Sequence, residues 1–205
     1  MALIDCSESS DNELFVVEGL SAANALSSVR DRRCQAVLPM QGKIPNARRT
    51  SLEKMLQHAQ VDELLRSIRP DQQVETSLTR FSFERVVLLS DPDADGLHAG
   101  LLLLLFLSTH IPALVEQGRL FTVRAPLCGF YQNDECVALA YTDKHAMTIA
   151  DELAETYSVA PARRRFKGVA SLDHNLRYSL MEKDNPTRHQ LTMVECQQLC
   201  QLIAM

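Results

Sequence analysis

Three aspartates alternate with other residues in one short segment of the chain. Asp91, Asp93 and Asp95 occupy every second position, and Gly96 follows them. Carboxylates at alternating positions fall on one side of an extended segment, where they repel one another unless a cation lies between them. Mg²⁺ prefers such oxygen ligands and usually takes one or two protein carboxylates beside water or phosphate oxygens. The segment is therefore a candidate magnesium site that could act on a phosphate group.

Two other interpretations of this segment compete with a metal site. Asp and Gly are common in turns, and an Asp can cap the helix that follows it. An EF-hand calcium loop starts with the same pattern but needs a glutamate at its twelfth position, where this chain has Leu102. The EF-hand interpretation therefore fails. A position directly after a buried strand favours the metal site over a plain turn, because ligands of open α/β sheets bind at the carboxyl ends of strands.

A second acidic point precedes a glycine earlier in the chain. Glu18 ends a short apolar run and Gly19 follows it. By itself this pair is typical of a turn. If its strand lies beside the strand that ends before Asp91, however, Glu18 would face Asp91 and Asp93 and complete a carboxylate cluster.

Alternating strands and helices must position these acids. Short apolar, β-prone runs predict strands over Glu13–Glu18, Cys34–Pro39, Arg85–Ser90 and Arg119–Val123. Helical spacing of apolar residues predicts helices over Ser21–Val29, Ser51–Ile68 (one helix or two), Leu97–Glu116 (kinked or broken at Pro112) and Asp143–Tyr157. Residues 69–80 are polar and are expected to form a surface loop. This order of elements predicts an α/β fold with a largely parallel sheet flanked by helices.

The pattern weakens after Pro126. Residues 163–205 have a mixed pattern that favours helices, and we expect them to form a mostly helical C-terminal appendage that takes no part in the sheet. The chain is accordingly divided into a metal-binding domain over residues 1–127 and a tail region over residues 128–205.

Composition and charge narrow the classes of function. Hydrophobic residues make up 46% and charged residues 23% of the 205 residues, as in a soluble globular protein. The formal net charge of −5 argues mildly against nucleic acid, because domains that bind it are usually basic. Bases nevertheless gather at residues 30–33, at residues 43–49 and at residues 163–167. Such runs are usually solvated surface, but a metal site that faces a phosphate backbone requires them too.

Secreted and membrane proteins are disfavoured. The six cysteines are scattered and form no CxxC pair, which indicates thiols in a reducing cytosol. The first residues lack the basic and apolar regions of a signal peptide. Leu101–Leu107 is apolar but far shorter than the roughly 20 residues of a membrane-spanning helix, so it indicates a buried helix.

The acidic motifs resemble a known family. Glu18–Gly19 after one strand and DxDxDG after a later strand are similar to the Toprim pattern of topoisomerases, bacterial primases and some nucleases. The similarity is closest to the Toprim domain of the B subunits of DNA gyrase and topoisomerase IV. It extends over nearly the whole chain and rests on Asn12–Ala23, Arg30–Pro39, Gly42–Ile44, Asp95–His98, Ile111–Pro112, Glu116–Gly118, Ala125–Leu127, Arg165–Gly168 and Asn185–Arg188.

The resemblance implies a Rossmann-like Toprim fold that binds Mg²⁺, or Mn²⁺ in its place. It implies that Glu18, Asp91 and Asp93 are metal ligands, with Asp95 a close or alternative ligand. Catalytic roles are implied for Glu18, Lys43 and His98, although a histidine that opens an apolar helix is more often structural. It further implies contacts to DNA from Arg30, Arg32, Lys43, Arg165 and Lys167.

The implied partners are DNA and an A-type subunit, whose tyrosine attacks a DNA phosphodiester while the metal assists cleavage and religation. No segment resembles the ATP-binding and transducer domains that precede Toprim in the intact family members. We therefore expect no ATP site in this chain, and an ATPase-domain polypeptide is a further candidate partner. No membrane partner is expected, and the implied location is cytoplasmic and associated with the nucleoid.

Several residues depart from the family pattern. Leu20 stands where the family usually has an aspartate, and Val169–Leu172 replaces Leu-Gly-Glu-Met. An arginine usual near Ala99 is absent, and the chain stops before the family's Arg-rich closing segment. These changes leave three functions open: a component of a type II topoisomerase, a catalytically reduced module that regulates DNA or the A-type subunit, and, third, an independent metal-dependent nuclease.

Overall fold

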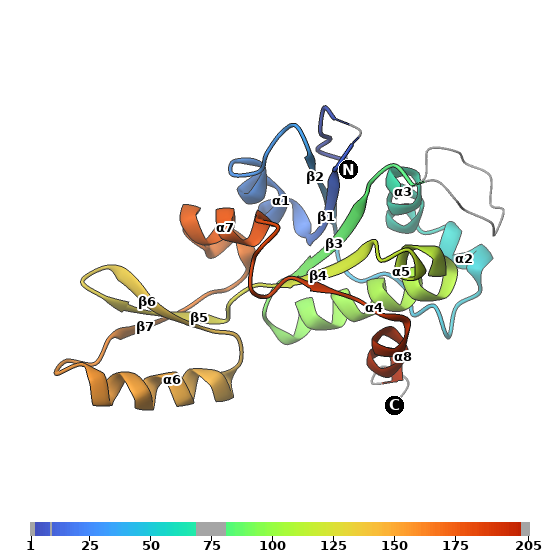
Figure 1. Ribbon diagram of the computed structural model, residues 1–205. Helices are drawn as coiled ribbons and strands as arrows, with labels where there is room; N and C mark the ends of the chain where they lie inside the picture. Colours follow the sequence, from blue (N-terminus) through green and yellow to red (C-terminus); the bar gives the residue numbers. More distant parts are fainter. Residues whose placement is uncertain (1–2, 9, 69–80, 202–205) are drawn as a thin grey trace.

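The computed structural model describes residues 3–8, 10–68 and 81–201, and the predicted loop over residues 69–80 lies outside this part (Figure 1). The strands are β1 (Glu13–Glu18), β2 (Gln35–Met40), β3 (Arg85–Ser90), β4 (Leu120–Arg124), β5 (Cys128–Gln132), β6 (Glu135–Ala140), β7 (Ala162–Arg165) and β8 (His189–Gln190). The helices are α1 (Gly19–Ser27), α2 (Leu52–Leu56), α3 (Ala59–Ile68), α4 (Ala94–His110), α5 (Pro112–Glu116), α6 (Asp143–Thr156), α7 (His174–Met181) and α8 (Met193–Gln201), with a 3₁₀ turn η1 (Val169–Ser171).

The main sheet has the strand order β2-β1-β3-β4-β8 within the described residues. The first four strands are parallel, and β8 is antiparallel to β4. Strands β1, β2 and β3 are almost continuously apolar because helices cover both faces of the sheet. The predicted α/β fold with a largely parallel sheet is confirmed.

Alternate residues of each strand build the two halves of the core. Leu14 and Val16 face the layer of α2, α3, α4, α5 and α8. Phe15 and Val17 face the opposite layer, which contains α1, η1 and α7. The main body is therefore a three-layer sandwich in which the sheet is the rigid central element (Figure 1).

A second sheet of order β6-β5-β7 projects from this body (Figure 1). Its strands are antiparallel. It packs against α6 through a small core of its own, made by Cys128, Phe130, Ala140, Ala146 and Ile149.

Several predicted boundaries change in the structure. Residues 51–68 form two helices, and the long helix predicted to end at Glu116 breaks between α4 and α5 at Pro112. Proline starts α5 there, because its fixed φ suits a first helical turn. Helix α1 begins at Gly19 rather than Ser21, so Ser21 is not its N-cap.

The prediction that residues 163–205 stay outside any sheet is wrong. Strand β7 pairs with β5, and β8 joins the main sheet beside β4. All four residues of β7 and both residues of β8 are exposed, so neither strand has the apolar alternation that identifies a strand in a sequence. The division at residue 127 remains a prediction, and η1, α7 and α8 return to pack on the body of residues 13–124.

Candidate metal centre

The two acidic motifs meet at one edge of the main sheet. Strands β1 and β3 are parallel neighbours with Val17 opposite Leu89, which confirms the expected adjacency. Glu18 ends β1, and Asp91 directly follows β3. Both acids therefore lie at the carboxyl edge of the sheet, where α/β proteins bind their ligands.

Glu18 carries a buried oxygen that lacks a partner. It occupies the N-cap position of α1 but makes no side-chain capping bond, and Gly19 turns the chain into the helix with a φ of 77°. Within the described part of the chain, Glu18 Oε2 is buried without any hydrogen bond. Burial raises the pKa of the Glu18 carboxyl, and the nearby charges of Asp91 and Asp93 raise it further.

Asp91 is half-buried and is held by the tail. Its Oδ1 accepts a hydrogen bond of 2.8 Å from the backbone N–H of Val169. Burial raises the pKa of Asp91, against the opposing effect of that hydrogen bond. A Cβ at Gly168 would lie 2.4 Å from Asp91 Oδ2, and one at Gly96 would lie 2.5 Å from the Asp91 carbonyl oxygen. Both glycines are needed for the close approach of backbone to this residue.

Asp93 and Asp95 already have partners. The Asp93 side chain caps α4 by accepting a bond of 2.7 Å from the backbone N–H of Gly96. Asp95 is exposed and forms an ion pair of 2.7 Å with Lys43, which lowers its pKa. The capped-turn interpretation thus describes Asp93 correctly, and it leaves Glu18 and Asp91 as the less satisfied pair.

A divalent cation fits this donor set. Among the described residues, no three Asp, Glu, His or Cys side chains converge closely enough to hold an ion by themselves. Mg²⁺ does not require three, because it usually takes one or two carboxylates and fills its octahedron with water. The unpaired Glu18 oxygen beside Asp91 supplies such a donor pair, and a cation between them would offset their repulsion.

The structure brings Lys43, His98 and Lys167 to this edge. Lys43 pairs with Asp95, and the His98 charge also acts on Asp95 from the first turns of the same helix. The backbone N–H of Lys167 donates to Ser171 Oγ at 3.0 Å, in the turn that places Gly168 against the Asp91 carboxylate. The ends of the long Lys43 and Lys167 side chains can therefore serve one bound anion.

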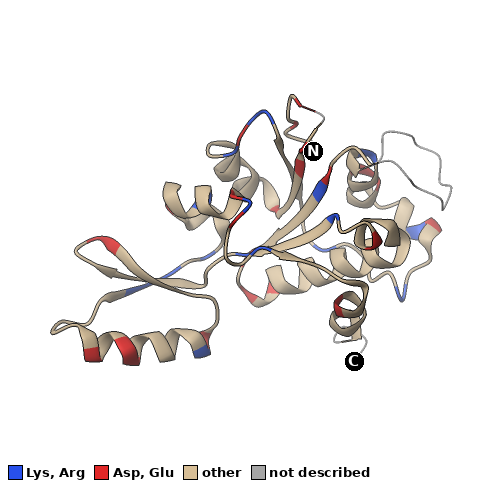
Figure 2. Ribbon diagram, viewed as in Figure 1, with Lys and Arg blue, Asp and Glu red and all other residues tan. Residues whose placement is uncertain are grey.

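The other predicted DNA contacts lie elsewhere. Arg30 and Arg32 precede β2 and thus lie at the opposite, amino edge of the sheet, and Arg30 donates to the carbonyl oxygen of Gln35. Arg165 belongs to β7 and pairs with Asp143 of α6 at 3.1 Å. Figure 2 shows the basic β7 beside the acidic α6. The structure does not bring Arg30 and Arg32 together with the carboxylates.

Sequence reasoning missed the groups that hold Asp91 from the tail. The N–H of Val169 and the hydroxyl of Ser171 give no signal in the sequence, because a backbone donor has no residue type and serines are common in turns. The nearby Lys167–Gly168 pair is indicated only by its resemblance to the family's tail motif.

A parallel α/β sheet with a Glu–Gly turn and a DxDxDG segment at its carboxyl edge defines a class of metal-binding domain. A family profile of the Toprim domain matches residues 13–124, which is more than half of the chain. The chain belongs to the Toprim domain family.

Relatives place it more narrowly within that family. It is 30% identical to the GyrB-type chain of the novobiocin-sensitive DNA gyrase of Streptomyces niveus, over 96% of this chain and 29% of that protein. It is 27% identical to the corresponding B-type chain of DNA topoisomerase 4 from Bacillus subtilis, over 79% of this chain and 25% of that protein. The chain is thus similar to the Toprim region of type IIA topoisomerase B subunits and spans less than a third of the length of these two relatives.

A solved structure shares the fold. The DNA-binding, cleavage and re-ligation domain of Plasmodium falciparum topoisomerase II superposes with a TM-score of 0.72 at 17% identity, over 91% of this chain and 26% of that one. Among the described residues, no helix is both long and apolar enough to cross a bilayer.

Proposed function

We propose that this chain is the Mg²⁺-dependent, DNA-binding Toprim component of a type II DNA topoisomerase, which assists DNA cleavage and religation together with a tyrosine-bearing A-type partner. The observation that carries the proposal is the buried, unpaired Glu18 oxygen beside the half-buried Asp91 carboxylate. The similarity to gyrase and topoisomerase IV B subunits supports the choice of reaction.

Glu18 and Asp91 would hold the cation, with Asp93 or Asp95 as a further ligand. The cation, when bound, would polarise a phosphoryl oxygen or stabilise a leaving oxygen. Lys43 and Lys167 would offset the charge of the DNA backbone. His98 would keep the Asp95 end of the site in place. Arg165 would extend the contact with DNA along β7, and contacts from Arg30 and Arg32 would require DNA to reach the opposite edge of the sheet.

The attacking group and any ATP hydrolysis would come from partners. The chain's own proposed role is limited to the metal, the phosphate and the docking of the A-type subunit. A polypeptide with an ATPase domain would be needed for coupling to ATP. A DNA partner would place the chain at the nucleoid.

The first test is Mg²⁺ and Mn²⁺ titration of the purified chain by calorimetry, with and without duplex DNA. We expect Glu18→Gln and Asp91→Asn to weaken binding by about tenfold or more, since even loss of an outer-shell partner commonly costs that much. Glu116→Gln, at an exposed position of α5, is the matched control and should bind as the parent does. Equal affinity of parent and Glu18→Gln would sink the metal assignment.

A second candidate is a catalytically reduced module that regulates DNA or the A-type subunit. It is favoured by Leu20, whose side chain is 46% exposed in the first turn of α1, where the family usually has an acid. Cleavage of supercoiled DNA by the chain mixed with an A-type subunit separates the two functions. Cleavage that Asp91→Asn abolishes supports the component, and metal binding without cleavage supports the regulator. Nicking by the chain alone would indicate a nuclease.

A further inference from the structure

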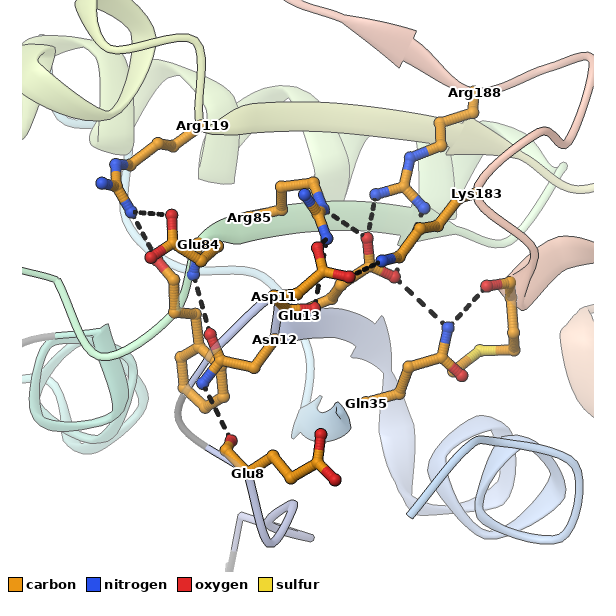
Figure 3. Close-up of polar contacts among 12 residues, drawn as sticks. Glu8, Asp11, Asn12, Glu13, Gln35, Glu84, Arg85, Arg119, Lys183 and Arg188 are labelled. Atoms are coloured by element: carbon orange, nitrogen blue, oxygen red, sulfur yellow. Dashed lines mark hydrogen bonds and ion pairs between the residues drawn. The ribbon is translucent and has the colours of Figure 1, made fainter. Parts of the chain in front are cut away.

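A charged side chain is buried at the start of the central strand. Glu13 is the first residue of β1, and its side chain has no solvent exposure. Arg85 Nε donates to Glu13 Oε1 at 2.6 Å, and Gln35 Nε2 donates to Oε2 at 3.2 Å (Figure 3). This cluster lies at the amino edge of the sheet, opposite the edge that carries Glu18.

The third partner of Glu13 comes from the tail. Arg188 donates to both carboxylate oxygens of Glu13, and its side chain is only 5% exposed (Figure 3). The guanidinium also lies 5.0 Å from the ring centroid of Phe121 on β4. Two-pronged pairing and stacking on an aromatic face are specific to arginine. Removing one partner of a buried pair leaves an uncompensated charge, so this contact strongly favours the docked tail.

The tail runs from one edge of the sheet to the other between two anchors. At the carboxyl edge Val169 donates to Asp91, and Gly168 packs on the same carboxylate. The tail then covers the α1 side of the core through η1 and α7. At the amino edge Gln35 Nε2 donates to the Met181 carbonyl oxygen at 2.6 Å, and Arg188 closes on Glu13.

We infer that Glu13 and Arg188 are positioning residues whose buried pair holds the Lys167–Val169 segment against Asp91. The segment carries its own weak local contacts, namely the Ser171 hydroxyl bonds and a single N–H donated to Asp91. The buried pair makes undocking of the whole tail costly, and so it keeps Lys167 at the carboxylate edge. This role rests on the proposed function and deepens it, but its structural part can be measured without any activity.

Native-state hydrogen exchange at the Val169 amide tests this role. We expect Arg188→Gln to raise exchange at Val169 by about tenfold or more, while amides in the middle of β1, such as Val16, keep their protection. Arg188→Lys retains the charge but lacks the fork, and it should restore part of the protection. Lys183→Gln is the matched control, because Lys183 lies on the same tail in a solvent-exposed pair with Asp11; it should leave Val169 unchanged.

Two results would overturn the inference. One is unchanged exchange at Val169 in folded Arg188→Gln or, if that variant does not fold, in Arg188→Lys. The other is an equal rise at Val169 and Val16, which would show that Arg188 serves global stability and does not position the segment. Mg²⁺ affinity is the second readout, and we expect it to fall in Arg188→Gln. If the parent chain binds no metal, the proposed function fails while the exchange result still decides the role of Arg188.

Discussion

Ser171 stands where the family's tail motif has an acid, and its hydroxyl takes over the local bonding. Ser171 Oγ accepts from the backbone N–H groups of Lys167 and Gly168 and donates to the Gly168 carbonyl oxygen at 2.7 Å. Ala170, at the position of a family glycine, is exposed within η1 and does not adopt a positive φ. Both departures therefore preserve the turn that meets Asp91, although the charge of the family's acid is lost.

Gly168→Ala tests the close approach at the same residue. The added Cβ would lie 2.4 Å from Asp91 Oδ2, so the carboxylate or the turn must shift. We expect a loss of about 1–3 kcal/mol in unfolding free energy, as for other overpacked sites, together with weaker Mg²⁺ binding. Urea denaturation and calorimetry measure the two effects. Ala170→Ser, at the exposed neighbouring position, is the control, and a Gly168→Ala variant as stable as this control would contradict the packing argument.

At the scale of the elements, prediction succeeded where burial writes a pattern. Strands β1 and β3 are apolar on both faces, and α4 is announced by its apolar run, so the expected edge with Glu18 and Asp91 follows from them. Strands β7 and β8 carry exposed side chains and are defined by backbone pairing alone. The same limit hid the buried role of Glu13, because an acid at the start of a strand gives no sign of arginines brought to it from Arg85 and Arg188.

Helix α8 depends on a capping box that responds to pH. The Thr192 backbone N–H donates to Glu195 Oε2 at 2.9 Å, and the Glu195 N–H donates to Thr192 Oγ1 at 3.3 Å. These bonds, with a contribution from His189, lower the pKa of Glu195 to about 2. A lowered pKa means that the stabilisation is complete above the ordinary pKa of 4.5 and is lost as the pH falls toward 2.

We therefore expect Glu195→Gln to flatten part of the acid dependence of stability. Urea midpoints measured from pH 6 down to about pH 2.5 should fall less for this variant than for the parent chain. Glu116→Gln serves as the reference for loss of an exposed acid outside a cap. Parallel curves for the parent and Glu195→Gln would show that the cap contributes nothing to folding.

At the scale of the whole molecule, the tail is part of the core. Helix α8 packs on α4 and buries Cys196 and Cys200, while α7 and η1 close the other side of the sheet. The predicted boundary at residue 127 marks a change in sequence pattern, but the elements on its far side complete the hydrophobic layers on its near side. A sequence read segment by segment does not show this, because long-range packing leaves no local spacing.

Thiol labelling reports on that packing. Cys136 is exposed, whereas Cys128, Cys196 and Cys200 are buried, and burial raises the pKa of Cys196 to about 11. With a thiol reagent near neutral pH, we expect Cys136 to react first and the three buried thiols to react only as the chain unfolds in urea. Cys136→Ser should remove the fast phase. Fast labelling of Cys196 and Cys200 without denaturant would mean that α8 leaves α4 in the native state.

The projecting sheet has β7 as an outer strand, and three successive arginines make up most of it. An open strand edge is a template on which a second chain can extend the sheet, and charged side chains are a common defence against this. Two copies of β7 that approached each other would bring six guanidinium groups together, against a mutual repulsion that grows as salt is removed. The arginine strand therefore acts as a gatekeeper that keeps an exposed β edge from assembling with copies of itself.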